Sequence, residues 1–218
     1  MWIWSGPSYV DGGNGQGMFH IRPLGEFKMS PSYELDPSLI DAWIFSGLRN
    51  EDAPASIVGE KGIELQCYNF AWNEEGSGFK DGALYFDGVD DYLAGPLNYK
   101  FTDFTIIMRR QVMKFASVCD VLNKGKVFIS ERTSWSTQTF CFTSFGEDTV
   151  KYPYNNDGMD NIIWMTPTKF HNSSPMVGYI DLTRGTFVDD GNSDLRVNNP
   201  YSASRFHRFK LEWFAIYS

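Results

Sequence analysis

The stretch GALYFDGVDDY, residues 82–92, is the part of the sequence that decides the fold. Its first half is a short run of apolar and aromatic residues, which is typical of a β-strand. Its Asp87-Gly88 pair is suited to a tight turn between two strands. A second apolar run follows this turn. We therefore expect one strand at residues 83–86 and another at residues 92–94.

Short apolar runs of the same kind recur along the chain, each bounded by Gly, Asn, Asp or Pro. No amphipathic helix pattern lies between them. The last run loses its alternation after Trp213, where Phe214 follows directly, so we expect a bulge or burial on both faces there, within a long central strand. The pattern predicts an all-β fold, a two-sheet antiparallel β-sandwich. The further strands that we expect are residues 42–45, 63–68, 104–112, 126–131, 137–143, 176–182, 186–188 and 206–217.

The size and charge of the chain narrow the function classes. Its 218 residues suit one large sandwich, and a hydrophobic share of 42% is enough for a sizeable core. A formal net charge of −8 repels a nucleic-acid backbone, so nucleic acid is not an expected partner. No apolar run is long enough for membrane insertion, and the N-terminus lacks the pattern of a signal peptide. We expect a component of a virion surface, or a surface component made in the cytoplasm.

Two regions of different composition divide the chain. Residues 1–36 contain a glycine-rich cluster at 11–17 and three prolines, which resist continuous helix or strand. We expect an extended N-terminal arm there and the sandwich at residues 37–218. Such an arm could dock on another protein surface or join copies into a homo-oligomer.

The three cysteines are Cys67, Cys119 and Cys141, and they form no C-x-x-C pair. This spacing favours neither a zinc site nor a disulfide framework. We expect buried free thiols.

Four segments in order resemble the laminin-G-like branch of the concanavalin A-like lectin and glucanase superfamily. They are LIDAWIFSG at 39–47, GALYFDGVDDY at 82–92, FTDFTI at 101–106 and LEWFAIY at 211–217. The resemblance implies a concanavalin A-like jelly roll whose curved faces and end loops bind glycans, proteins or calcium. Members include polysaccharide-active enzymes, lectin-like modules and phage structural proteins, so the fold does not choose a function.

Aromatic residues next to amides in loop-rich segments are candidates for glycan binding. The apolar face of a pyranose stacks on an aromatic ring, while amides and carboxylates bind its hydroxyl groups. Taken singly, each of these residues is more commonly explained by loop packing. The candidates are Trp72, Asn73, Trp135, Tyr152, Tyr154 and Asn155.

Asp87, Asp90 and Asp91 are the densest carboxylate group beside a turn. Calcium prefers oxygen ligands from carboxylates and loop carbonyls, so these three residues are the candidate metal site. Turn capping by Asp87 and Asp90 explains the same residues without a metal. No cofactor is required, and calcium is the ion that this group suits.

Catalytic patterns are sparse. The superfamily's glycoside hydrolases place carboxylates on alternate positions of one strand, and a retaining mechanism needs two of them about 5 Å apart. The nearest approach, Glu34-Leu35-Asp36-Pro37, lacks a third carboxylate and has a proline unsuited to a central strand. The three histidines belong to no catalytic motif. We therefore expect no enzyme, and a polysaccharide hydrolase ranks last.

Two functions of different classes remain. The first is a non-catalytic, lectin-like module displayed on a cell or virion surface, with a glycan or another protein surface as its partner. The alternative is a phage virion structural protein, such as a head-fibre or decoration protein, docked or oligomerised through residues 1–36.

Overall fold

The computed structural model describes residues 36–73, 75–101, 103–114, 118–124, 127–133, 138–144, 148–153, 161–167, 169–173, 178–181, 194–198 and 206–218. In these residues the chain forms β-strands and one short 3-10 helix, η1 (Asn50–Asp52). No helix of this part could cross a membrane. The sandwich unit comprises Ser38–Ser218. The predicted arm, residues 1–36, lies outside the described residues except for Asp36, so it stays a prediction.

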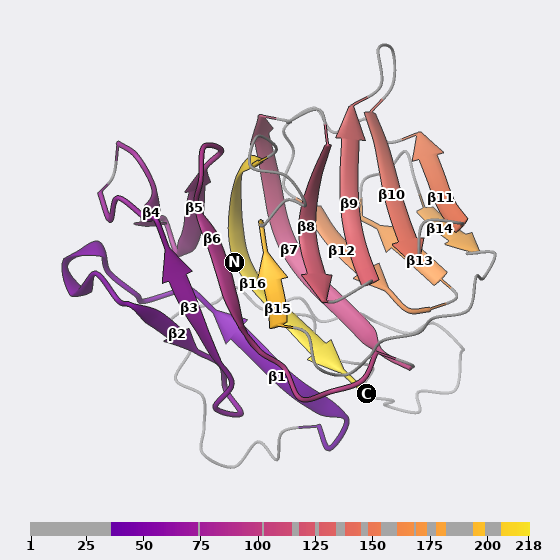
Figure 1. Cartoon of the computed structure of the whole chain (residues 1–218), viewed down its shortest axis with the longest axis horizontal. Coiled ribbons are helices and arrows are strands. Elements are labelled where there is room, and N and C mark those ends of the chain that lie inside the picture. The colour runs from indigo at the N-terminus through magenta and orange to yellow at the C-terminus, as the bar shows by residue number, and fades with distance from the viewer. Residues whose placement is uncertain are drawn as a thin grey trace, which may run out of the picture. The chain divides into compact units, whose positions relative to one another are not determined.

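Two antiparallel sheets face each other, as Figure 1 shows. The strands of the first, here called the β16 sheet, are β1 (Leu39–Ile44), β4 (Gly78–Lys80), β5 (Ala83–Asp87), β7 (Thr105–Lys114), β12 (Asn161–Met165), β13 (Lys169–Asn172), β14 (Gly178–Asp181) and β16 (Arg208–Tyr217). Their order is β14-β13-β12-β7-β16-β5-β4, and β1 also pairs with β16.

The second sheet, here called the β6 sheet, lies toward the viewer in Figure 1. Its strands are β2 (Ser56–Val58), β3 (Glu64–Tyr68), β6 (Tyr92–Pro96), β8 (Val118–Lys124), β9 (Val127–Thr133), β10 (Gln138–Ser144), β11 (Asp148–Pro153) and β15 (Asp194–Val197). Their order is β11-β10-β9-β8-β15-β6-β3-β2. The expected all-β sandwich is confirmed.

β16 is the long central strand that the sequence predicts. One of its edges pairs with β7 along its length. The other edge is shared, because β5 pairs with residues 208–211 and β1 with residues 213–217. The pairing with β7 shifts register between Leu211 and Trp213, so Glu212 forms a bulge, and Phe214 behind it is buried. The predicted irregularity at this point is confirmed.

Side chains from both sheets form one apolar core. The β16 sheet contributes stacked aromatic pairs, Trp43 on Phe214 and Phe86 on Phe209, each with ring centroids 4.5 Å apart. The β6 sheet contributes smaller aliphatic residues from alternate strand positions, which are Leu65, Leu93, Leu122, Leu195 and Val197. The core thus fixes which face of each strand points outward.

Most expected strands occur within a few residues of their predicted bounds, and seven strands were not predicted. These are β2, β4, β8, β11, β12, β13 and β15. Residues 186–188, where another strand was expected, lie outside the described residues. Several unpredicted strands are only three or four residues long, too short to show a periodicity.

Candidate functional site

The FDGVDDY motif builds the turn that joins β5 to β6, residues 87–91, here called the aspartate turn, whose first residue, Asp87, is also the last of β5. Phe86 is 1% exposed in the core. The Asp87 Oδ1 accepts a hydrogen bond of 2.7 Å from the Val89 backbone N–H, which confirms the capping role of Asp87. Gly88 has a φ of +82°, and a Cβ there would lie 2.9 Å from the backbone nitrogen of Arg208. Only glycine suits this position.

Asp91 is the buried acid of the aspartate turn, with 0% exposure. Its Oδ2 accepts a hydrogen bond of 2.7 Å from the Asp87 backbone N–H, and its Oδ1 accepts one of 3.1 Å from the Ser77 hydroxyl. Burial first, and the nearby charge of Asp87 as a smaller cause, raise the pKa of the Asp91 carboxyl to about 7. Asp91 is therefore the buried hydrogen-bond acceptor that stabilises this turn.

A second loop, between β3 and β4, lies against the aspartate turn. It comprises residues 69–77, and residue 74 is outside the described part. The Ser77 hydroxyl that bonds Asp91 also accepts a hydrogen bond of 3.0 Å from the Ala71 backbone N–H. The Asn69 side chain donates a hydrogen bond of 2.9 Å to the backbone carbonyl of Asp90. Two hydrogen bonds thus join the loops, which together we call the loop pair.

The loop over residues 69–77 holds one aromatic candidate and one amide candidate, and it is hydrogen-bonded to the turn that holds the acidic group. Trp72 is half-buried and stacks on Phe70 with a centroid distance of 4.9 Å. Its backbone φ of +52° is unusual for an aromatic residue and is held by the loop. Asn73 is exposed, and its Oδ1 accepts a hydrogen bond of 2.6 Å from the Gly76 backbone N–H. The Trp72 ring has a packing role, and its role in glycan binding stays a prediction.

The three aspartates of the turn lie close enough to share a cation. One carboxylate oxygen from each of Asp87, Asp90 and Asp91 can be chosen so that all lie within 4.8 Å of one another. Asp90 is exposed, whereas Asp87 and Asp91 are engaged with backbone N–H groups of the turn. The donors suit calcium, but a bound ion would have to draw on two carboxylates that already stabilise the turn.

The remaining predicted glycan-binding residues lie in less described parts of the chain. Tyr152 lies in β11 opposite Phe140, and its side chain is outside the described part. Trp135, Tyr154 and Asn155 are outside the described residues. The structure therefore does not test these four residues.

A stacked tyrosine pair beside the loop pair was not predicted as a site. Tyr68 ends β3 and Tyr92 begins β6, and the two are register partners. Their ring centroids are 4.4 Å apart with an interplanar angle of 7°. Tyr68 is 38% exposed. The alternation of Leu65, Gln66, Cys67 and Tyr68 was the sequence signal that could have placed Tyr68 on the outer face.

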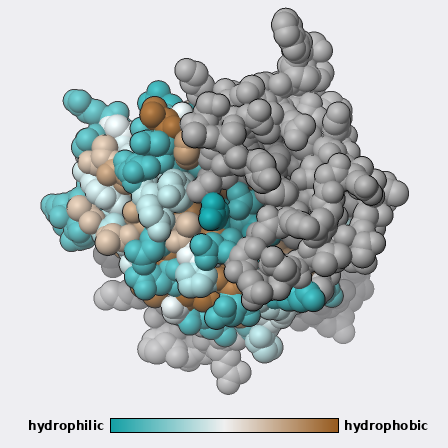
Figure 2. Space-filling view, viewed as in Figure 1, coloured by the Kyte–Doolittle hydropathy of each residue, from teal (hydrophilic) through white to brown (hydrophobic). Residues whose placement is uncertain are grey.

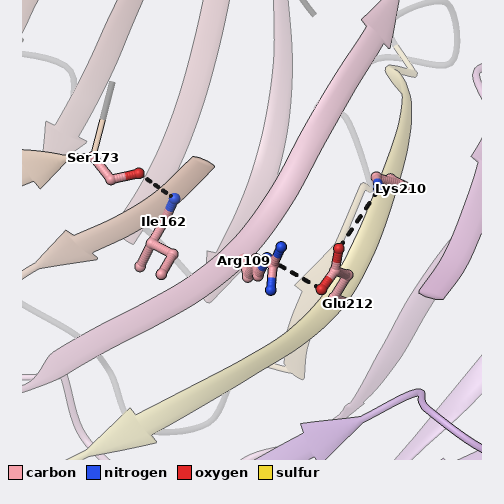
Figure 3. A network of polar contacts seen from close by, with 5 residues as sticks. All are labelled: Arg109, Ile162, Ser173, Lys210 and Glu212. Atoms are coloured by element: carbon pink, nitrogen blue, oxygen red, sulfur yellow. Dashed lines mark hydrogen bonds and ion pairs between the residues drawn. The ribbon is translucent and has the colours of Figure 1, made fainter. Parts of the chain in front are cut away.

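The outer face of the β16 sheet carries a separate charged cluster. Figure 3 shows Glu212, the bulged residue of β16, between Arg109 of β7 and Lys210. The Arg109 Nε lies 3.1 Å and the Lys210 Nζ 3.5 Å from the Glu212 carboxylate. These side chains are 13–20% exposed. The Arg109–Glu212 pair joins β7 to β16, and together the two ion pairs engage both oxygens of Glu212, which is unsuited to acid catalysis.

This fold and these loops define a two-sheet antiparallel β-sandwich domain, and comparisons with known proteins agree with that class. No protein-family model matches the sequence, and no curated protein matches it significantly. Solved structures do match. A sialidase from Trypanosoma rangeli in complex with sialic acid has a TM-score of 0.60 at 11% identity, over 84% of this chain and 31% of that chain. The chain thus spans about a third of the sialidase's length.

Two other similar structures are separate domains of larger proteins. Domain 4 of AbnA, a GH43 extracellular arabinanase from Geobacillus stearothermophilus, was solved in complex with arabinotriose. It has a TM-score of 0.55 at 12% identity, over 83% of this chain and 92% of that chain. The binding domain of botulinum neurotoxin DC, in complex with rat synaptotagmin II, has a TM-score of 0.56 at 10% identity, over 83% and 48% of the two chains. At these identities the similarity shows the fold alone.

Proposed function

We propose that this domain is a non-catalytic carbohydrate-binding module, displayed on a cell or virion surface, that binds glycans at the loop pair and the tyrosine pair beside it. One observation carries the proposal. The loop with Trp72 and Asn73 is separated from the aspartate turn by β4 and β5, and two hydrogen bonds join the two loops at the end of β3 and the start of β6. Aromatic rings, an amide and carboxylates thereby meet at one end of the sandwich, which is the composition of a sugar site.

The similar solved structures support the choice of probe. Domain 4 of the arabinanase is matched over nearly its whole length and was solved with arabinotriose. A sandwich of this form can therefore hold a sugar without the rest of an enzyme. The motif FDGVDDY, in which Phe86, Asp87, Gly88 and Asp91 have structural roles, supports our further proposal that the chain is a concanavalin A-like domain of the laminin-G-like branch.

A non-catalytic role fits the chemistry of the loop pair. Asp91 is the carboxyl whose pKa is raised to about 7, as a general acid requires. Its carboxyl is fully buried and accepts hydrogen bonds from Ser77 and Asp87, so a glycosidic oxygen could not reach it. Protonation of Asp91 therefore affects the stability of the fold and does not serve catalysis.

The test is a glycan-array screen of the full chain, with and without calcium, beside light scattering. We expect reproducible binding that weakens about tenfold in Asn73→Ala, whose side chain is exposed. Silence of the array together with a defined oligomer that is lost on removing residues 1–36 would contradict this function. That result would favour the virion structural protein instead.

Calcium is proposed as an optional ion at the aspartate turn, and Asp90→Asn tests it cleanly. Asp87 and Asp91 stabilise the turn themselves, so changing either would confuse lost binding with lost folding. Asp90 is exposed, and its replacement by asparagine would keep the backbone carbonyl that bonds Asn69. Titration calorimetry should show calcium binding to the wild type that is weaker by about tenfold or more in Asp90→Asn. No heat of binding in the wild type would leave the three aspartates as turn residues only.

A further inference from the structure

The alternation of side chains in β3 and β6 shows which of their residues lie on the outer face of the β6 sheet. In β3, Leu65 is in the core and Cys67 packs against it, so Gln66 and Tyr68 point to the outer side. In β6, Leu93 is in the core, so Tyr92 and Ala94 point outward. The register pairs Tyr68 with Tyr92 and Gln66 with Ala94. The two tyrosines therefore form one row of this face, and Gln66 and Ala94 begin the next.

Arg196 of β15 continues the second row. Leu195 and Val197 are buried, so Arg196 lies on the outer face, and its register partner is Ala94. Within the described residues we find no ion pair or hydrogen bond of its guanidinium. Burial and the neighbouring Tyr68 raise the pKa of the Tyr92 hydroxyl, and the charge of Arg196 acts against that rise. The guanidinium is therefore near a phenol that stays protonated at neutral pH.

The charges of this face favour an uncharged ligand. Glu64 and Asp194 are exposed and occupy the row beyond Gln66 and Arg196 on the same side of their strands. Glu64 bonds the hydroxyl of Ser56. Two carboxylates next to one guanidinium leave the described part of this face over β3, β6 and β15 without net positive charge, and the chain as a whole carries −8. A carboxylated sugar would meet repulsion here, whereas hydroxyl groups would meet both donors and acceptors.

The chemistry of the first two rows matches one ring of a neutral saccharide. The stacked tyrosines cover one face of each other, and the other face of the exposed Tyr68 ring is the surface for the apolar C–H face of a pyranose. Arg196 and Gln66 lie in the row next to the tyrosine pair. Their N–H groups can donate hydrogen bonds to sugar hydroxyl groups, and the amide oxygen of Gln66 can accept them. Figure 2 shows this side of the molecule, where hydrophilic residues border small apolar patches over β2, β3 and β6. The arrangement is that of an open sheet-face site.

We propose that Tyr68, Tyr92, Gln66 and Arg196 form a subsite for an uncharged sugar ring on the outer face of the β6 sheet. The proposal rests on the proposed function, because it names the class of sugar and the face that this module uses. Tyr68 is the stacking platform, and Tyr92 holds its ring in place from the neighbouring strand. Arg196 and Gln66 bind hydroxyl groups.

Affinity gel electrophoresis tests this subsite with the full-length protein. The probes are two neutral polysaccharides, arabinan and galactan, and one carboxylated polysaccharide, polygalacturonate. The variants are Tyr68→Ala, Tyr68→Phe, Arg196→Gln and Arg196→Lys. Val58→Ala is the matched control, because Val58 is 61% exposed on the same sheet and lies outside the subsite. Circular dichroism checks that each variant is folded, and Arg196→Gln alone tests the subsite if Tyr68→Ala does not fold.

We expect the wild type to be retarded by at least one neutral probe and not by polygalacturonate. Tyr68→Ala and Arg196→Gln should weaken binding by about tenfold, and Arg196→Lys should recover only part of it. Tyr68→Phe should keep the stacking and lose less, and Val58→Ala should match the wild type. Unchanged binding in Tyr68→Ala, with loss in Asn73→Ala, would overturn the subsite while the proposed function stands. A preference for polygalacturonate would overturn the sugar class. No retardation with any probe, and a silent glycan array, would end both proposals.

Discussion

The carboxylate of Asp91 accepts a hydrogen bond of 2.7 Å from the backbone N–H of Asp87, the residue at which β5 ends. A buried acid here closes the turn that leads into β6. The backbone carbonyl of Asp91 also accepts a hydrogen bond of 3.0 Å from the Asn198 side chain, which follows β15. One residue thus links the turn to a segment more than a hundred positions away, and its protonation should be visible in the stability of the domain.

The first prediction concerns pH and Asp91. Its pKa is about 7 in the folded protein against 3.8 ordinarily, so the folded state binds this proton more tightly than the unfolded chain. Its contribution to the free energy of unfolding is therefore full below about pH 4 and is lost as the pH rises through about 7. Asp91→Asn keeps the shape and should remove this loss. Urea unfolding of both proteins between pH 4 and 8 measures it, and parallel pH curves would contradict it.

The second prediction concerns His207, which acts in the opposite direction. Burial first, and the charge of Arg110 second, lower the pKa of His207 to about 3. Because the unfolded chain takes up a proton near 6.5 and the folded protein does not, this residue costs stability as the pH falls from 6.5 toward 3. His207→Gln should therefore gain stability relative to the wild type as the pH is lowered from about 7 to about 4. A gain independent of pH would contradict the shift.

The third prediction concerns Asp41, whose buried carboxylate accepts three backbone N–H bonds, from Ala42, Lys61 and Ile63, at 2.7–2.8 Å. Asn in place of Asp41 would set an amide donor against at least one of these N–H groups. We expect a loss of about 2–3 kcal/mol in the free energy of unfolding. Glu60→Gln, an exposed change in the same turn, is the control and should stay within about 0.5 kcal/mol of the wild type.

A double-mutant cycle sharpens this test. A Cβ at Gly59 would lie 2.4 Å from the Asp41 carboxylate, so Gly59→Ala should destabilise the wild type. In an Asp41→Ala background the obstructing atoms are gone, and the same change should cost much less. Additive losses in the cycle would show that the two residues do not compete for the same space.

The fourth prediction concerns Cys67, which is a free thiol, as expected from the sequence, but is half-buried and not fully buried. Burial raises the pKa of Cys67 to about 12. At pH 8 only about 10⁻⁴ of it is thiolate, the form that reacts with iodoacetamide. Peptide mapping after a short exposure should find Cys67 unmodified in the native protein and modified in urea. Rapid native modification would mean that β3 opens locally.

How much the sequence predicts depends on the length of the element and the range of its contacts. The strand over Arg208–Tyr217 is long enough to show its alternation and the interruption near Trp213, so its central place and its bulge could be predicted. β4 and β15 are too short for that, and β4 begins with Gly78 at a φ of +138°. Their existence depends on the strands beside them.

The residues of the candidate site divide in the same way, into those that a local pattern predicts and those that only the pairing of strands brings together. The aspartates and Trp72 could be predicted because they lie in loop-rich segments, where binding residues concentrate and which local composition identifies. Tyr68 and Tyr92 were treated as strand residues, and only the register shows that they meet on the outer face. That register depends on a pairing between strands separated by the whole of β4 and β5. A local pattern carries no information on such a pairing.

The central position of β16 determines when the sheet can form while the chain is being synthesised. β1, β5 and β7 leave the ribosome well before β16, yet each of the three pairs with it along one edge. Until Tyr217 has been added, the middle of this sheet is empty and the apolar rings of Trp43 and Phe86 lack Phe214 and Phe209. Folding of this sheet must therefore wait until β16 has been synthesised, and the strands made before it depend on protection from aggregation until then.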